Sequence, residues 1–255
     1  MEHFSITQLQ TYLLCPQSYR FAYVERREWE FQPASLLFGK VIHSVIADLF
    51  RNHGEISKED MIKMFESRWD NEVESSGNVR FRSLSQDELK ERGGKLISLF
   101  HERFSDLEAQ EVELFFEIPL LDLQTGSFAD NVVQGRIDLI SDGSIYEIKT
   151  SSRRMSQEDA DRSLQLTFYA WAYQYLYGKP AGSLRIINLI KTKKPRIQVL
   201  ETKREMEDFG RLYRLMVGVI SAIKKEVFYP NPLYAYGCDN CPFRSTCRDE
   251  VNQDG

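Results

Sequence analysis

The sequence predicts an α/β fold in which a small mixed β-sheet is flanked by helices. Two pairs of β-branched runs, at 134–150 and 184–202, have the pattern of antiparallel strand pairs, and a further apolar run covers 111–121. Apolar residues at helical spacing occur at 5–14, 36–50, 156–178 and 204–227. Because strands and helices alternate along the chain, we expect the helices to cover the faces of one sheet.

Composition describes an ordinary globular chain. Hydrophobic residues make up 42% of the 255 residues, and the net charge of −5 argues against generic coating of nucleic acid, although a local basic cleft is compatible with it. The chain has no secretory signal pattern, no apolar run of membrane-spanning length and no phosphate-binding loop of an ATP-driven motor. We therefore expect a cytoplasmic protein that stays out of membranes, with four cysteines as metal ligands or free thiols.

The N-terminal third is predicted to be helical. Ser5 and Gln8 form a capping box, and that first helix ends at Cys15, before a proline. In the helix at 36–50, His43 lies one turn after Gly39. A lone histidine there is commonly structural, but a glycine one turn away lets a ligand approach. Two further helices start at Ser57 and Ser85, and we interpret residues 51–110 as a helical insertion in a single domain, 1–255.

The segment Gln134–Thr150 is predicted to be a β-hairpin that turns at Asp142-Gly143. Counting from this turn places Asp138 opposite Glu147 and Arg136 opposite Lys149. One face of the hairpin then carries the apolar residues Ile137, Leu139, Tyr146 and Ile148, and the other carries the four charged ones.

The charged face allows two interpretations. It could be a solvated surface, in which diagonal ion pairs soften the contact between like charges. Alternatively, a divalent cation between Asp138 and Glu147 would remove their repulsion across the strand pair, and Lys149 would point at what the metal holds. In the preceding strand, Glu113 and Glu117 point the same way, and either is a candidate for a further acidic group near that metal.

Three later segments carry candidate binding residues. A helix is expected from Ser156 to Gly178, and Gln165 and Tyr169 share one of its faces, either as core or as lining of a site. The tip between the last two strands is basic, either as a soluble edge or as a phosphate-binding surface, with Arg153 and Arg154 as second candidates. The residues at the tip are Lys191, Lys193, Lys194 and Arg196. Near the C-terminus, cysteines spaced C-x2-C-x5-C could join Cys15 around zinc or an iron–sulfur cluster; they are Cys238, Cys241 and Cys247.

These motifs resemble one known superfamily. Asp138 followed by Glu147-Ile148-Lys149 is similar to the signature of the PD-(D/E)XK nucleases. The Gly39-x3-His43 pair, the Gln165-x3-Tyr169 pair and the four cysteines resemble its RecB-like branch, in particular the CRISPR-associated RecB-like exonuclease, AddB and exonuclease V families.

The resemblance implies a restriction-endonuclease-like core and a metal-dependent deoxyribonuclease, an exonuclease acting on single-stranded DNA or DNA ends. In that interpretation Asp138, Glu147, His43 and the carbonyl of Ile148 bind Mg²⁺ or Mn²⁺, Lys149 is catalytic, and Gln165 and Tyr169 contact DNA. The four cysteines would hold a 4Fe–4S cluster that clasps the chain ends together. A partner helicase or CRISPR adaptation complex is a further expectation. The alternative function is a catalytically silent clamp that binds DNA through the same cleft.

Overall fold

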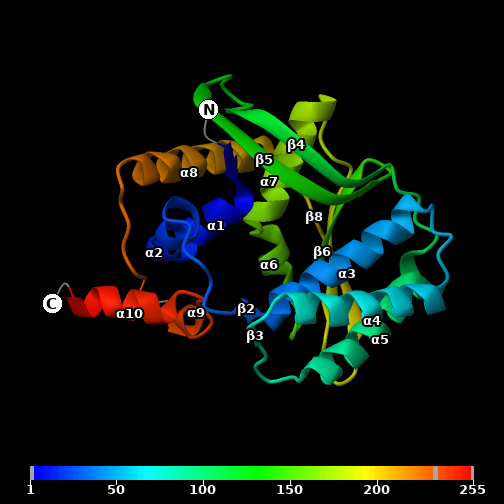
Figure 1. Ribbon diagram of the computed structural model, residues 1–255. Coiled ribbons are helices and arrows are strands. Elements are labelled where there is room, and N and C mark those ends of the chain that lie inside the picture. Colours follow the sequence, from blue (N-terminus) through cyan, green and yellow to red (C-terminus); the bar gives the residue numbers. More distant parts are fainter. Residues whose placement is uncertain (1–2, 232–234, 254–255) are drawn as a thin grey trace.

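A six-stranded mixed sheet forms the centre of the molecule (Figure 1). The computed structural model describes residues 3–231 and 235–253. The strands run in the order β1-β5-β6-β7-β8, and β4 pairs with the other edge of β5. Their bounds are β1 His3–Ser5, β4 Glu111–Leu121, β5 Phe128–Ser141, β6 Ser144–Ser151, β7 Leu184–Ile190 and β8 Arg196–Thr202; β2 Gln32–Pro33 and β3 Val79–Arg80 form a separate parallel pair. The α/β class with a mixed sheet flanked by helices is thus confirmed.

Strand β5 pairs with two different strands along one edge. Its residues 132–134 pair with β1 in parallel, and its residues 139–141 pair with β6 in antiparallel orientation. The predicted turn is confirmed, since Asp142 and Gly143 have φ of 47° and 64°, and so is the register Leu139–Tyr146. Between the two partners, β1 and β6 leave a short stretch of β5 without a strand on that edge. We call this stretch, residues 135–138, the β5 fork.

The predicted pairing fails inside the fork. Asp138 and Glu147 are not opposed in the ladder, because β6 turns away after Tyr146 and Asp138 Oδ2 instead accepts a hydrogen bond from the backbone N–H of Ile148, at 2.8 Å. Arg136 likewise does not oppose Lys149; it lies 3.6 Å from Glu113.

The prediction of one apolar face on the hairpin is wrong for one of its four residues. Ile137 packs in one core cluster, whereas Leu139, Tyr146 and Ile148 pack in the other. Residues 137 and 139 would share a face in a regular strand, so the alternation of side chains breaks at the fork.

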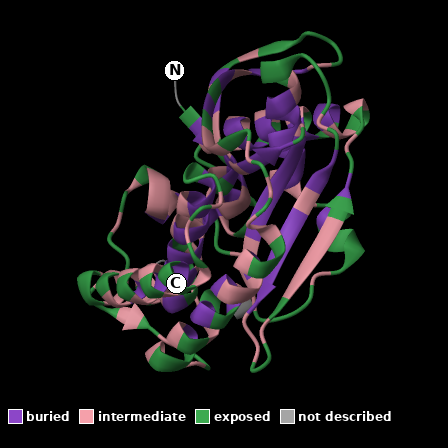
Figure 2. Ribbon diagram, turned by 90° about the vertical axis from the view of Figure 1, so that its right-hand side faces the viewer, coloured by how far each residue is buried: buried purple, intermediate pink, exposed green. Residues whose placement is uncertain are grey.

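Helices cover both faces of the sheet, so that the sheet lies between two cores. Helices α3 (Ala34–Arg51), α4 (Lys58–Ser75) and α5 (Gln86–Phe104) pack with Leu139, Ile148 and Ile187 on one face. On the other face lie α1 (Ile6–Leu14), α7 (Leu164–Tyr177) and α8 (Met206–Lys224). In Figure 2 the strands are largely buried between helices whose outer sides are exposed. The remaining helices are α2 Pro16–Tyr19, the π-helix η1 Arg20–Val24, α6 Gln157–Asp161, α9 Ala235–Asp239 and α10 Arg244–Gln253.

Helix starts were largely predictable from capping residues. The boxes at Ser5, Ser85 and Ser156 are present, and Gly178 ends α7 with φ of 68°. The single helix predicted over 156–178 is wrong, because it is two helices, α6 and α7. Ser163 caps the second helix by accepting from the N–H of Leu166. In the described part of the chain, no helix is both long and apolar enough to cross a membrane.

Two adjacent glycines in α5 give a matched test of packing. An added Cβ at Gly93 would lie 2.0 Å from the buried ring of Phe65, whereas at Gly94 it would meet Ile62 at an ordinary 3.5 Å. Both changes to alanine favour the helix by about 1 kcal/mol. We expect Gly94→Ala to raise the free energy of unfolding, and Gly93→Ala to lower it by about 1–3 kcal/mol through overpacking. Urea denaturation of the two variants measures this. Equal effects of the same sign would contradict the packing of α4 on α5.

Candidate metal centre

Three potential metal ligands converge beside the β5 fork. They are His43 of α3, Glu113 of β4 and Asp138 of β5, and one ligand atom from each lies within 4.8 Å of the other two. The Nδ1 atom of His43 lies 3.3 Å from Oδ1 of Asp138. This is the set of nitrogen and oxygen donors that a divalent cation such as Mn²⁺ accepts.

The fork explains why Asp138 is held here. Because β6 leaves β5, the backbone N–H of Ile148 has no strand partner, and Oδ2 of Asp138 takes that role. The second oxygen of the same carboxylate remains directed at His43. Helix α3 is close to β6 at this level, since an added Cβ at Gly39 would lie 3.6 Å from Oγ1 of Thr150. This is an ordinary contact distance, so the role of Gly39 as a point of close approach stays a prediction.

Glu147 and Lys149 of β6 complete the polar side of the site. Lys149 Nζ is 2.7 Å from Oε1 of Glu147. The Glu147 side chain is only 2% exposed, and its Oε2 is buried with no hydrogen-bond partner in the described structure. Burial, and then the charge of Asp138, raise the pKa of Glu147 to about 7, while Lys149 opposes this shift. A buried carboxylate oxygen without a donor is costly, and a bound cation would satisfy it.

The pKa values of the neighbouring ligands His43 and Glu113 are also raised. Burial would lower the pKa of His43, but the hydrogen bond to Asp138 and the surrounding carboxylates outweigh it and raise the pKa to about 9. Burial, followed by the charge of Asp138, raises the pKa of Glu113. The cluster therefore holds an excess of negative charge in partly buried positions, so a divalent cation would be strongly attracted to it.

Helix α7 reaches the site from the other face of the sheet. Lys149 Nζ donates to Oε1 of Gln165, and Nε2 of Gln165 donates to the hydroxyl of Tyr169 at 2.9 Å. Tyr169 is 4% exposed, and burial raises its pKa. The structure thus places these two predicted DNA-contact residues next to Lys149, where they fix the position of its ammonium group.

Glu113 is the site residue that sequence reasoning left undecided. Strict alternation would put Glu113 and Glu117 on the same face of β4, but Glu117 lies 3.1 Å from His3, away from the metal group. Glu113 has a φ of 54°, a conformation rare for a residue with a side chain. Its position opposite the β5 fork decides between them, and that fork was not visible in the sequence.

The four cysteines lie where the two ends of the chain meet. Cys15 follows α1, and the other three lie in 238–247; all four are free thiols. A cavity of about 300 Å³ is lined by Cys15, Cys238 and Cys241. Burial raises the pKa of Cys247, and the charges of the other three thiols raise it further, so the four are close together. Hydrogen bonds join the same segments, including those from the N–H of Gln17 to the carbonyl of Tyr229 and from the N–H of Glu30 to the carbonyl of Pro242.

The basic tip between β7 and β8 lies apart from this centre. Lys193, Lys194 and Arg196 are exposed. Lys191 instead places its ammonium 5.3 Å from the centre of the Phe38 ring, and burial lowers its pKa.

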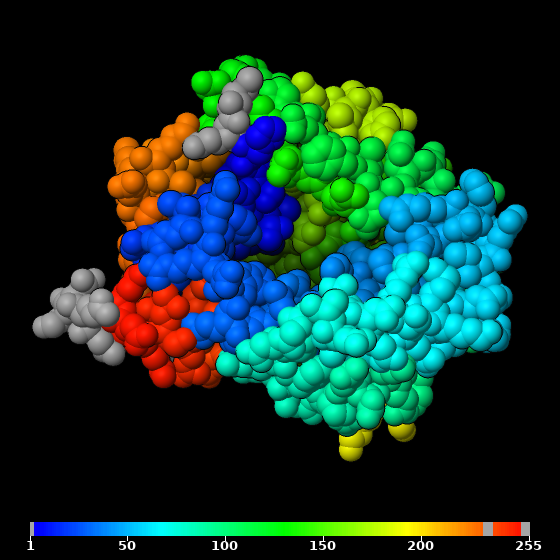
Figure 3. All heavy atoms as spheres, in the orientation of Figure 1, coloured from blue at the N-terminus to red at the C-terminus, as the bar shows by residue number. Residues whose placement is uncertain are grey.

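On the molecular surface, a hollow opens between three parts of the chain (Figure 3). The N-terminal helices, the strands β4 and β5, and the helices α3 and α4 surround it. The metal group is contributed by α3, β4 and β5, which are elements of two of these walls.

Comparisons with known proteins agree with this architecture. Residues 3–248 match the sequence model of the PD-(D/E)XK nuclease superfamily. Among solved structures, the chain is similar to a protein from Eubacterium rectale described as a "putative exonuclease", with a TM-score of 0.61 and 12% identity, over 97% of this chain and 88% of that one. At this identity the likeness shows a shared fold. No curated protein matches the chain.

The two glutamates of β4 provide a matched test of the metal group. We expect Glu113→Gln to weaken Mn²⁺ binding by at least about tenfold, a loss that residues around metal sites commonly cause. Glu117→Gln removes the same charge from the same strand and should bind Mn²⁺ as the wild type does. Calorimetric titration with Mn²⁺ measures both affinities. Equal affinities in the two variants would remove Glu113 from the centre.

Proposed function

Because the chain belongs to the PD-(D/E)XK nuclease superfamily, we propose that it is a metal-dependent deoxyribonuclease that acts on single-stranded DNA or DNA ends. The observation that carries this proposal is the buried Oε2 of Glu147, which lacks a partner beside Asp138, His43 and Lys149. An unpartnered carboxylate oxygen costs stability in a protein core, whereas in phosphodiester hydrolysis by metal ions it can bind the cation.

We infer that Asp138, Glu147, His43 and Glu113 hold Mg²⁺ or Mn²⁺, together with the carbonyl of Ile148. When bound, the cation supplies positive charge at the phosphate and lowers the pKa of a coordinated water. Asp138 also orients Ile148, because its Oδ2 accepts from that residue's N–H. One carboxylate thus positions the ligand-bearing backbone of β6 as well as facing His43.

Lys149 is the residue proposed to stabilise charge that develops on the phosphate. Its ammonium is held between Glu147 and Gln165, so it needs little reorganisation when the reaction begins. Tyr169 supports Gln165 from the next turn of α7. The amide of Gln165 and the phenol of Tyr169 also suit contact with a phosphate or a base at this position.

An unpaired strand fits the surroundings of the centre. Phe115, which is 53% exposed, pairs in the β4–β5 ladder with Arg136, and the Arg136 guanidinium lies 5.9 Å from its ring centre. Both residues are on the strands that carry Glu113 and Asp138. An exposed ring beside a cation can stack on a base and pair with a phosphate, and bases are free to do so in single strands and frayed ends.

We also propose that the four cysteines bind a 4Fe–4S cluster as a structural clasp. Four thiols with one ligand far from the other three suit such a cluster. A single tetrahedral zinc would need sulfur atoms about 3.8 Å apart. In the described residues, which include all four cysteines, the only group of three ligands within 4.8 Å is the one at His43. No three of the four sulfur atoms therefore meet within 4.8 Å as ligands of one small ion would, and we favour the larger cluster.

Single substitutions at the centre test the nuclease proposal. We expect Asp138→Ala and Glu147→Ala to abolish cleavage of labelled DNA, and Lys149→Ala to lower kcat by about 10²–10³-fold, as for loss of one charge-stabilising donor. His43→Ala should lose most activity. Mn²⁺ should support cleavage at least as well as Mg²⁺, because an imidazole ligand favours transition metals, and EDTA should stop it. Glu117→Ala is the matched control with full activity.

Two outcomes would overturn this assignment. Cleavage of DNA by purified Asp138→Ala would show that the assignment of the site is wrong. DNA binding by the wild type with no cleavage in either metal would favour the alternative function, a catalytically silent clamp that binds DNA through the same cleft.

The clasp has its own test. Anaerobically purified protein should be brown, and Cys15→Ser, Cys238→Ser, Cys241→Ser or Cys247→Ser should each bleach it and lower its melting temperature. The reason is that the cluster closes a loop containing every catalytic residue, and long cross-links contribute up to several kcal/mol. Stoichiometric zinc without iron or sulfide would replace the cluster by a zinc clasp.

A further inference from the structure

A pocket at the carboxyl ends of β6 and β7 gathers positive charge that the metal centre does not use. The cavity measures about 420 Å³ and is lined by two segments that are distant in sequence: Arg153, Arg154, Ile190, Thr192, Lys193, Lys194 and Arg196. We call it the basic pocket. Five of its seven residues are basic and none is acidic. In the described part of the chain, none of the five forms an ion pair. In a protein of net charge −5, this local concentration of exposed cations would attract an anion.

Hydrogen bonds hold the backbone of both segments while leaving the charged groups free. Gln198 of β8 donates to the carbonyl of Met155 at 2.9 Å and accepts from the N–H of Met155 at 3.0 Å. Ser151 Oγ donates to the carbonyl of Arg153 at 2.6 Å. On the facing segment, Thr192 Oγ1 donates to the carbonyl of Lys194 at 2.7 Å. The backbone around the pocket is therefore held by hydrogen bonds, and it presents exposed cationic groups.

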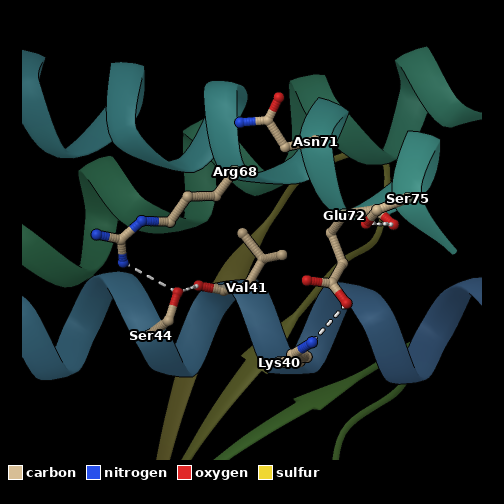
Figure 4. Close-up of a pocket in the computed structure, with 7 residues that line it drawn as sticks. All are labelled: Lys40, Val41, Ser44, Arg68, Asn71, Glu72 and Ser75. Atoms are coloured by element: carbon tan, nitrogen blue, oxygen red, sulfur yellow. Dashed lines mark hydrogen bonds and ion pairs between the residues drawn. The ribbon is translucent and has the colours of Figure 1, made fainter.

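In the groove between α3 and α4, by contrast, two basic residues have acidic partners. That groove, of about 360 Å³, contains Lys40 and Arg68 (Figure 4). Lys40 lies 2.6 Å from Glu72, and Arg68 pairs with Asp48 and Ser44. Its cations thus form ion pairs within the protein, whereas the described structure shows no ion pair for those of the basic pocket, although Arg153 is near enough to Asp159 to contribute to its lowered pKa.

Strand β6 connects the metal centre with the basic pocket. Beyond Tyr146 this strand pairs only with β7 among the described strands, and on the side of β5 its edge carries no strand from Glu147 to Ser151, where the N–H of Ile148 donates to Asp138. Ser151 lies four residues of extended strand beyond Glu147, a distance of about 13 Å. Arg153 lies two residues further on, and its carbonyl accepts a hydrogen bond from Ser151 Oγ. At about 3.4 Å per nucleotide of a stacked strand, this separation corresponds to about four nucleotides.

We propose that the basic pocket binds the phosphates of the substrate strand about four nucleotides from the scissile bond, and so sets the strand length that the enzyme needs. This inference rests on the proposed nuclease function. Arginine and lysine heads on both sides of one cavity suit a flexible chain of phosphates, which can bend to reach several of them. Free polyphosphate shares this chemistry, so the experiment includes it.

The test compares two double variants with a control of equal charge change. Arg153→Ala/Arg154→Ala and Lys193→Ala/Lys194→Ala each remove two cations from the pocket. Lys224→Ala/Lys225→Ala removes two exposed cations at the end of α8. Binding of a long fluorescent oligonucleotide is measured in EDTA over a range of salt concentrations. Cleavage with Mn²⁺ is measured on that oligonucleotide and on fragments shorter than about four nucleotides.

In both pocket variants, we expect the slope of log K against log salt to fall in magnitude by about 0.7 for each lost phosphate contact. The KM for the long strand should rise several-fold, while turnover of the short fragments stays unchanged. The control should match the wild type throughout.

Three results would overturn the proposal: unchanged salt slopes, equal losses on long and short substrates, or weaker binding of tripolyphosphate with no change in strand binding. If the wild type binds DNA and cleaves none, the nuclease proposal fails, while the binding arm still decides whether the pocket anchors the strand.

Discussion

The hydrogen bond between Asp138 and the backbone of Ile148 is the contact on which the site depends. An antiparallel ladder between β5 and β6 would normally use that N–H for the partner backbone, and would put Asp138 and Glu147 side by side. Here the strands separate after Leu139–Tyr146, and a carboxylate oxygen replaces the missing carbonyl. The opening admits His43 from one face of the sheet, and the β6 residue Lys149 contacts α7 on the other. The two cores hold these layers rigidly, so the opening persists as a preformed site.

The negative charges gathered in the opening between β5 and β6 cost stability, but they are the groups that would bind a cation. Asp138, Glu147 and Glu113 gather negative charge where water is scarce, and the pKa values of Glu147 and Glu113 rise as a result. Lys149 compensates only part of this, because one oxygen of Glu147 keeps no partner. The surrounding fold tolerates the cost through large apolar layers, including fully buried Trp69, Trp171 and Phe38. Strain confined to a functional site and supported by a well-packed core is a common arrangement in enzymes.

Local chemistry explains which features the sequence could predict. Capping boxes and the Asp142-Gly143 turn depend on neighbours a few residues away, and they were found where the pattern placed them. The break between α6 and α7 was missed although Ser163 caps α7 locally, and a distant residue, Arg204, also binds the backbone there. This side chain, about 40 residues away, donates to the carbonyls of Ala160 and Ser163. The fork escaped for the same reason, since β1, from the very start of the chain, occupies the edge of β5 that β6 leaves. Glu113 could be chosen over Glu117 only once that fork was known.

The distribution of charge separates chemistry from strand holding. Negative charge is concentrated at the metal group, where it attracts cations and would repel a phosphate without them. Exposed positive charge with no ion pair in the described structure is found at the basic pocket, one short stretch of β6 away. A strand bound only at the pocket would leave its next phosphates beside an acidic cluster, which is unfavourable until a cation neutralises the carboxylates. In the function that we propose, productive binding of the strand would therefore be coupled to binding of the metal through the spacing of the two sites alone.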